Sequence, residues 1–410
     1  MPRLINFLLL CSFIGIAHAA IPQFQLPKTS LGPEDLAVII NDEDPLSRHI
    51  GDYYQKQRHI PKANLIHVHF KPGAALMDVT EFNRINAEVD AKTPVSVQAF
   101  ALTWAAPYRV DCMSITSAFA FGFNKSFCSI KQCDPTKPSP YFNSASVSPY
   151  TQLKVRPTMA LAGLDFKSVK ALIDRGIKSD GSHPQGSGYL LSTNDKQRNV
   201  RAVNYQKLVK MSAKIIRMNL IKKDYIQDKK DVMFYFTGLE NVPALNTLRF
   251  KPGAIADHLT SAGGQLTDSS HQMSSLRWLE AGATGSYGSV VEPCNHLSKF
   301  PNPGLVTYWY LQGNTLIEAY WKSVQWPGEG IFIGEPLANP YGGYNINVTN
   351  DEIILLTWSL PPGKYSLLGS ISVEEPFIAE SPVVKITNLG LHELRFKNSG
   401  KSVYRLIQVH

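Results

Sequence analysis

The feature that most constrains this chain is an alternation of strand-length apolar runs with helix-length segments near its beginning. Residues 36–40 (LAVII), 64–70 (NLIHVHF) and 95–104 (VSVQAFALTW) are predicted strands. Residues 47–60 and 79–91, which separate them, have helix-type spacing of apolar side chains. Strands separated by helices of this length predict right-handed βαβ units on a mostly parallel sheet.

The same alternation continues further along the chain. Predicted helices cover residues 166–177 (after Asp165 as N-cap), 204–223, 274–281 and 304–324, and predicted strands cover residues 231–237, 283–291 and 330–333. From about residue 344 the pattern changes to short alternating runs without helices. We therefore expect an α/β domain with flanking helices over residues 20–343. Residues 344–410 are expected to form a small all-β module, a reduced immunoglobulin-like sandwich.

Residues 111–157 interrupt the alternation with three cysteines and five prolines. A loop of this length inside a compact domain is usually functional or disordered. We interpret it as an ordered excursion over the sheet edge, pinned by a disulfide.

Residues 1–19 are predicted to be a secretory signal peptide. Arg3 precedes an apolar run over residues 4–17, and Ala17-His18-Ala19 is a small-x-small cleavage pattern. The run is shorter than the roughly 20 residues that span a membrane. We expect cleavage after Ala19, a secreted or periplasmic location, and no transmembrane segment afterwards.

Removal of the signal peptide takes away Cys11 and leaves Cys112, Cys128, Cys133 and Cys294. An oxidising compartment favours their pairing, and four cysteines allow three connectivities. Cys128 and Cys133 are close enough in sequence to close a small loop, and Cys112 and Cys294 would then pair or stay free. The sequence does not decide among these.

Composition and motifs exclude several classes of protein. Hydrophobic residues make up 44% of the chain, which excludes disorder for most of it. The net charge of +8 is modest and forms no obvious block, so no nucleic-acid partner is expected. No P-loop, G-x-G-x-x-G, C-x-x-C or H-E-x-x-H pattern occurs, so we predict neither a cofactor nor a metal.

Ligands of open α/β sheets bind outside the carboxyl ends of the strands. This rule selects Trp104, Arg109 and Asp111 after the third strand, and Asn295 and His296 after the strand at residues 283–291. These five are our candidate ligand-binding residues.

A catalytic interpretation centres on Cys294 at the same strand end. A thiol activated by a nearby imidazole is a nucleophile, and His258 is the candidate base. Glu292 or Asp257 would orient that base. The competing interpretation is that Cys294 is one half of a disulfide.

Two further patterns have alternative interpretations. Residues 308–321 (YWYLQGNTLIEAYW) are predicted to be either an aromatic sugar platform or a core-facing helix. His67 and His69 share one face of a strand, which is typical of a half-exposed strand.

Four segments resemble a family of exported bacterial proteins of unknown function, which implies no activity. They are LAVIINDEDPLSRHIGDYYQKQRHIP, LTWAAPYRVDCMSITSAFAFGF, GAIADHLTSAGGQL and WLEAGATGSYGSVVEPCN. A more distant resemblance, carried by FYFTG, WLEAGATGSYGSV and IGEPL, is to the gingipain-type cysteine peptidases. It implies a caspase-like α/β sheet followed by an immunoglobulin-like module.

The same resemblance implies that the peptidase dyad is missing. Leu239 stands where the family has its catalytic His, and residues 261–264 (SAGG) stand where it has its nucleophilic Cys. Without a thiolate and a base the standard mechanism fails. Our leading hypothesis is therefore an exported, non-catalytic binding or assembly protein with an envelope protein or glycan as partner. The alternatives are a cysteine-dependent hydrolase that uses Cys294, and a carbohydrate-binding protein.

Overall fold

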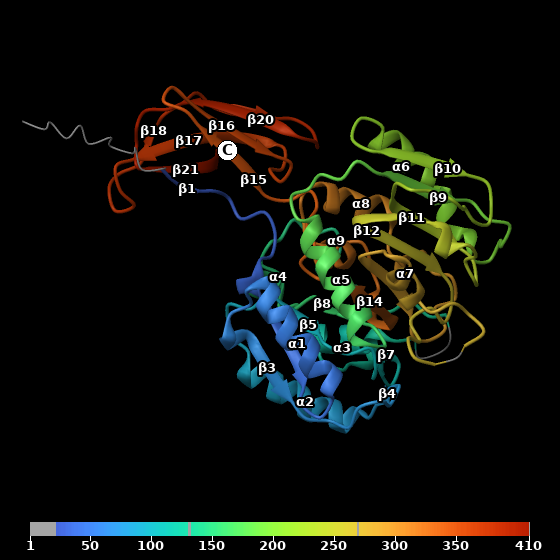
Figure 1. Cartoon of the computed structure of the whole chain (residues 1–410). Coiled ribbons are helices and arrows are strands. Elements are labelled where there is room, and N and C mark those ends of the chain that lie inside the picture. The colour runs from blue at the N-terminus through green and yellow to red at the C-terminus, as the bar shows by residue number, and fades with distance from the viewer. Residues whose placement is uncertain (1–21, 130–132, 269, 410) are drawn as a thin grey trace, which may run out of the picture.

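The computed structural model describes residues 22–129, 133–268 and 270–409, so the predicted signal peptide lies outside the described residues. Figure 1 shows an α/β domain with an all-β module at its side. This mixed α/β organisation agrees with the sequence prediction. Among the described residues, no helix is long and apolar enough to cross a membrane.

A ten-stranded sheet forms the centre of the α/β domain. In spatial order its strands are β10 (Arg217–Ile221), β9 (Ser187–Leu191), β11 (Val232–Gly238), β12 (Phe250–Leu259), β13 (Gly285–Ser289), β14 (Gly330–Gly334), β8 (Thr158–Ala160), β5 (Ala99–Leu102), β2 (Leu36–Asn41) and β3 (Leu65–Val68). All neighbours are parallel except β13 and β14, which are antiparallel. The sheet thus consists of two parallel halves that run in opposite directions.

Helices cover both faces of this sheet. They are α1 (Pro45–Arg58), α2 (Val79–Lys92), α3 (Ile115–Phe121), α4 (Pro149–Leu153), α5 (Phe166–Ser179), α6 (Tyr205–Ser212), α7 (Leu276–Ala281), α8 (Pro303–Leu311) and α9 (Leu316–Trp321). One hydrophobic cluster includes side chains of α1, α6, α8 and α9, and another includes side chains of α2, α3 and α7. The predicted N-cap is confirmed, since the Asp165 side chain accepts a hydrogen bond from the Ser168 N–H at the start of α5.

Two predicted helices are wrong in part. The predicted helix over residues 204–223 ends at Ser212, and residues 217–221 form strand β10 instead. Residues 217–221 are a strand because they pair with β9, and the local sequence pattern gives no sign of that non-local contact. The predicted helix over residues 304–324 is divided into α8 and α9 around Gly313, whose φ is +79°.

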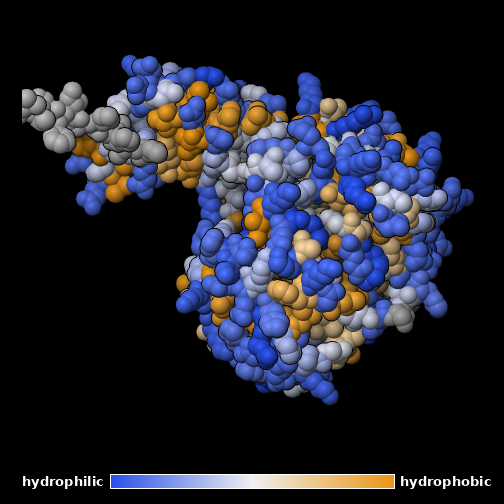
Figure 2. Space-filling view, in the orientation of Figure 1, coloured by the Kyte–Doolittle hydropathy of each residue, from blue (hydrophilic) through white to orange (hydrophobic). Residues whose placement is uncertain are grey.

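The all-β module consists of two sheets around one core. The first sheet contains β15 (Tyr344–Val348), β16 (Glu352–Thr357) and β20 (His392–Lys397). The second contains β1 (Gln23–Gln25), β21 (Val403–Val409), β17 (Gly363–Ser370), β18 (Ile378–Ala379) and β19 (Val384–Ile386). Side chains of both sheets share a single hydrophobic cluster. Apolar side chains also gather on the outer surface of the module (Figure 2).

Strand β1 changes the expected domain boundary. It pairs in parallel with β21, from Gln23 opposite Val403 to Gln25 opposite Arg405. The first described strand therefore belongs to the C-terminal module, whereas the sequence analysis assigned it to the α/β domain. This contact is non-local, so no periodicity in the sequence indicates it.

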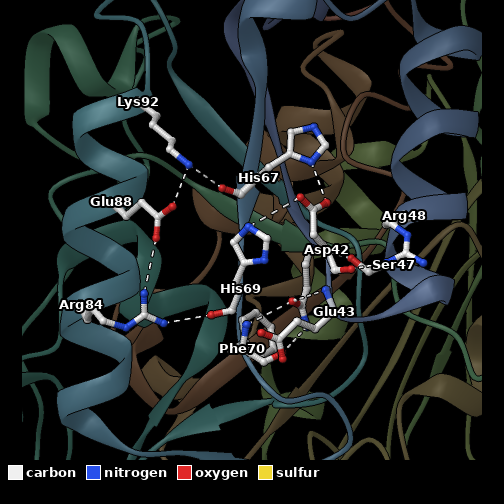
Figure 3. Close-up of polar contacts among 11 residues, drawn as sticks. Asp42, Glu43, Ser47, Arg48, His67, His69, Phe70, Arg84, Glu88 and Lys92 are labelled. Carbon is white, nitrogen blue, oxygen red and sulfur yellow. Dashed lines mark hydrogen bonds and ion pairs between the residues drawn. The ribbon is translucent and has the colours of Figure 1, made fainter.

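The outer edge of β3 is closed by side chains (Figure 3). The main-chain carbonyl of His67 accepts a hydrogen bond from Lys92 Nζ at 2.8 Å, and that of His69 accepts one from Arg84 Nη2 at 2.9 Å. Glu88 forms an ion pair with each of these cations. Asp42, which directly follows the inner neighbour β2, accepts a hydrogen bond from His67 Nδ1 at 2.8 Å. Both imidazoles are about half exposed, as the strand interpretation predicted.

Candidate functional site

The four cysteines of the described chain form two disulfides. Cys112 is joined to Cys128, and Cys133 is joined to Cys294. The excursion at residues 111–157 is therefore pinned at two points, and its described part is ordered as expected. The small loop that a Cys128–Cys133 bond would close does not form.

Cys294 is thus half of a disulfide and has no thiol to act as a nucleophile. The predicted catalytic role of Cys294 is wrong in this structure. The neighbouring candidate residues Glu292 and His296 form hydrogen bonds around the disulfide of Cys294. Glu292 accepts a hydrogen bond from the Cys294 N–H at 2.8 Å, and His296 donates through Nε2 to the Cys133 carbonyl. Asn295 lies between them with a φ of +57°.

His258 is a buried core residue. Its Nδ1 accepts a hydrogen bond from Trp278 Nε1 at 3.0 Å, and its Nε2 donates to the Met273 carbonyl at 3.0 Å. Burial lowers the pKa of His258 to about 3, so the imidazole is neutral at physiological pH. Both ring nitrogens are occupied, and neither reaches Cys294 by a hydrogen bond. The predicted role of His258 as the base that activates Cys294 is not supported.

Asp257 pairs with Arg201 inside the domain. Arg201 Nη1 lies 2.6 Å from Asp257 Oδ1, and Arg201 Nη2 donates to the Thr237 carbonyl at 2.7 Å. Burial raises the pKa of Asp257 despite the opposing charge of Arg201. Both side chains are almost fully buried, so this pair links η4 (Asn199–Asn204) to β11 and β12. The Arg201–Asp257 pair therefore stabilises the fold, and neither side chain is exposed to solvent.

Backbone closes the strand ends where the peptidase resemblance would put its dyad. Leu239 is half buried beside the end of β11. A Cβ on the preceding Gly238 would overlap the carbonyl group of Arg198, and one on Gly264 would overlap the backbone of Gly288. The main chain packs directly against itself at these glycines. A residue with a side chain therefore does not fit at Gly238 or Gly264 without a shift of the backbone.

The other predicted ligand-binding residues do not form one site. Trp104 is buried and donates through Nε1 to the Pro107 carbonyl at 3.2 Å. Arg109 is half buried, and Asp111 is exposed and 3.9 Å from Lys125. In the described part of the chain, no hydrogen bond or ion pair joins these three to Asn295 or His296.

A cavity of about 550 Å³ lies between α6 and α8 instead. It is lined by Asn143, Asn204, Lys207, Leu208, Met211, Asn302, Gly304, Leu305, Tyr308 and Trp309. Asn302 Oδ1 caps α8 and Asn143 Oδ1 accepts from Trp309 Nε1, which leaves both amide NH₂ groups without a partner among the described residues. The Asn204 side chain also has none there. The cavity therefore offers hydrogen-bonding groups that the protein does not use.

A second cavity of about 490 Å³ continues from the same aromatic residues toward the all-β module. It is lined by Pro27, Lys28, Thr29, Ala145, Val147, Tyr308, Trp309, Gln312, Asn314, Ser359, Leu360, Pro361, Tyr365, Leu406, Ile407 and Gln408. We call the two cavities together the aromatic groove. Its lining contains no Asp, Glu, His or Cys. The groove therefore offers no carboxylate, imidazole or thiol to a bound molecule.

Tyr308 and Trp309 stand where the two cavities meet. Their rings are edge to face, with centroids 5.1 Å apart. The ammonium of the buried Lys322 lies 4.4 Å from the centroid of Trp309, which fixes that ring. Tyr310, Tyr320 and Trp321 are buried in the core. The core-facing alternative is thus confirmed for these three side chains, and the sugar platform stays a prediction for Tyr308 and Trp309.

A third cavity, of about 570 Å³, contains charged residues that are already paired. Arg58 and Asp180 line it and form an ion pair with each other. Arg58 Nε also donates to Glu335 Oε1 at 3.1 Å. These charges hold α1, α5 and the end of β14 together, so they are accounted for without a ligand.

No family model and no curated protein matches the chain. Two solved structures align with most of it. One is a protease, with 11% identity, a TM-score of 0.34, and coverage of 93% of this chain and 98% of that one. The other is the complex of Porphyromonas gingivalis RgpB pro- and mature domains, with 9% identity, a TM-score of 0.37, and coverage of 92% and 100%. Both likenesses are distant, and at these TM-scores they assign no chemistry.

Proposed function

We propose that this chain is a non-catalytic binding protein of the cell envelope that holds a glycan in the aromatic groove. The lining of the groove carries the proposal, because it combines three aromatic rings and unused amide groups with an absence of carboxylates. Glycoside cleavage generally needs two carboxylates across the scissile bond. The groove is therefore suited to binding a sugar and not to cutting it.

The chemistry of a sugar matches this lining. The C–H face of a pyranose ring packs on an aromatic ring such as Trp309, while amide groups exchange hydrogen bonds with its hydroxyls. Lys207 adds a positive charge that no described ion pair uses, whereas Lys28, in the other cavity, is paired with Asp35. We therefore expect acidic glycans to bind more tightly than neutral ones of the same length.

An envelope location rests on two features of the chain. The predicted signal peptide favours export, and disulfides persist in oxidising compartments. Both are consistent with a protein that meets envelope polysaccharides.

The test is affinity electrophoresis of the purified chain in gels that contain soluble acidic or neutral glycans. Trp309→Ala should weaken binding by about tenfold, the equivalent of about 1.4 kcal/mol. Asn204→Ala, whose side chain has no protein partner among the described residues, should weaken it severalfold without unfolding the chain. Leu164→Ala, which changes an exposed side chain outside the groove, is the matched control. Absence of retardation by every glycan, or wild-type retardation of Trp309→Ala, would refute the proposal.

The rival hydrolase hypothesis has a separate test. Iodoacetamide should leave the unreduced native chain unlabelled at Cys294, because its sulfur is bonded to Cys133. Labelling of Cys294 in the native, unreduced protein would restore the hydrolase as a candidate.

A further inference from the structure

The outer edge of β10 has backbone groups without partners. β10 is the last strand of the sheet and pairs with β9 alone, from Arg217 opposite Ser187 to Ile221 opposite Leu191. The Ile221 carbonyl accepts from the Ser192 N–H at 2.9 Å, so residues 217, 219 and 221 face β9. Because successive residues of a strand point their N–H and C=O groups to opposite sides, those of Met218 and Leu220 point outward.

No hydrogen bond within the described residues uses these outward groups. The Leu220 side chain is 39% exposed, so the edge is open at this position. A row of unpaired N–H and C=O groups is a template on which another extended chain can pair.

The surroundings of this edge are strongly basic. Eight cations lie at residues 205–231, none of them in an ion pair within the described chain: Lys207, Lys210, Lys214, Arg217, Lys222, Lys223, Lys229 and Lys230. The same stretch contains three acidic residues, so it supplies more than half of the chain's net charge of +8. Figure 2 shows a predominantly hydrophilic surface over α6 and β10.

The cations continue beyond the end of the strand. A cavity of about 620 Å³ at the carboxyl end of β10 is lined by Lys222, Lys223 and Lys229. Ile221, Tyr225 and Ile226 line the same cavity and give it an apolar side. An extended chain that pairs with β10 would place its side chains beside these groups.

We propose that β10 is a docking edge to which an acidic, extended peptide segment of a partner protein adds as a further strand. Main-chain hydrogen bonds to Met218 and Leu220 would give affinity, and the lysines would select carboxylates. A second copy of this chain is disfavoured, because its own β10 edge carries the same charge. An anionic membrane fits less well, since lipid offers no partner strand to the backbone groups.

Apart from Lys207, which also lines the aromatic groove, the residues that carry this inference lie outside the proposed glycan site. Met218, Leu220, Lys222 and Lys223 do not line the aromatic groove. Variants at the edge therefore leave the groove intact, and variants in the groove leave the edge intact.

The experiment measures fluorescence anisotropy of a labelled peptide in which Glu and Val alternate, with the full purified chain. A peptide with Lys in place of Glu is the control probe. We expect the acidic peptide alone to bind, and its affinity to fall as salt is raised. Failure of the acidic peptide to bind at low salt would overturn the proposal. So would binding of the chain to anionic vesicles without binding to the acidic peptide.

Two variants separate backbone pairing from charge. Leu220→Pro removes one outward N–H and leaves the ladder to β9 intact, so the chain should fold and lose at least about tenfold in affinity. Lys222→Glu with Lys223→Glu should cause a similar loss. Lys62→Glu with Lys71→Glu, which changes two exposed cations near the opposite edge, is the matched control and should bind as the wild type does. A folded Leu220→Pro variant with wild-type affinity, or a wild-type affinity in the Lys222/Lys223 pair, would overturn the proposal.

Discussion

The two outer edges of the ten-stranded sheet are built differently. At β3, Lys92 and Arg84 of α2 cap the outward carbonyls of His67 and His69, and Glu88 holds both cations in place. At β10, the outward groups have no described partner, and the nearby cations are unpaired. One edge is closed by contacts and the other is protected by charge alone, so they should respond differently to salt and to a peptide.

The neighbouring helices explain this difference. Helix α2 places Arg84, Glu88 and Lys92 four residues apart, so that they lie on one face beside β3. Helix α6 ends at Ser212, and Leu208 packs its apolar side into the core. No side chain of α6 donates to β10 among the described hydrogen bonds. Because α6 is short and its apolar side packs into the core, the outer edge of β10 stays uncovered.

The largest predicted effect is on the free energy of unfolding, and it tests whether the half of the sheet that ends at β10 is loosely folded. Asp257→Asn leaves the buried Arg201 without its counter-ion, which should lower the free energy of unfolding by about 3–5 kcal/mol. Urea titration followed by tryptophan fluorescence measures this. Glu352→Gln, which breaks the exposed pair with Arg395, is the control and should cost less than about 1 kcal/mol. If both variants lowered the free energy of unfolding equally, the buried pair would not hold the interior of this half of the sheet together.

A second prediction concerns acid. The pKa of His258 is about 3 in the folded chain, below its ordinary value near 6.5, so between these pH values the unfolded chain binds a proton that the folded chain does not. The stability from this group is complete above about pH 6.5 and falls by about 1.4 kcal/mol per pH unit toward pH 3. Urea titrations at several pH values measure the slope. His258→Asn should flatten it, and an unchanged slope in that variant would disprove the assignment.

The smallest predicted effect makes the closed edge resemble the open one. Arg84→Ala with Lys92→Ala removes both caps from β3 and should cost only about 1 kcal/mol, because the contacts are exposed. Hydrogen exchange of residues 65–68 should become faster, while exchange in β10 stays unchanged. Lys62→Ala is the control. Unaltered exchange in β3 would show that the caps contribute nothing to closing the edge.

Local pattern predicted a large part of the fold and a small part of the site. The apolar run at residues 36–40 and the capped helix after Asp165 were predicted correctly, since their signals lie within the segments themselves. β12 was missed because Asp257 and His258 look unsuited to a buried strand. Their partners, Arg201 and Trp278, come from other segments and make the burial possible.

The groove shows the same limit. Tyr308 and Trp309 belong to an aromatic run for which the sequence predicted either a sugar platform or a core-facing helix. Asn143, Asn204 and Asn302 come from three separate segments and carry no shared motif, so nothing in the sequence joins them. Cys294 was correctly given a second interpretation as a half-cystine, while its partner Cys133 was not predicted.

The pairing of β1 with β21 has a consequence for synthesis of the chain. The ribosome makes residues 23–25 before the α/β domain and residues 403–409 after it, yet the two segments are neighbours in one sheet. Domains generally fold as units while the chain emerges. This module cannot be completed in that way, because its first strand must remain unpaired until the whole α/β domain has been made. The parallel contact can therefore form only after the α/β domain between the two segments has been synthesised.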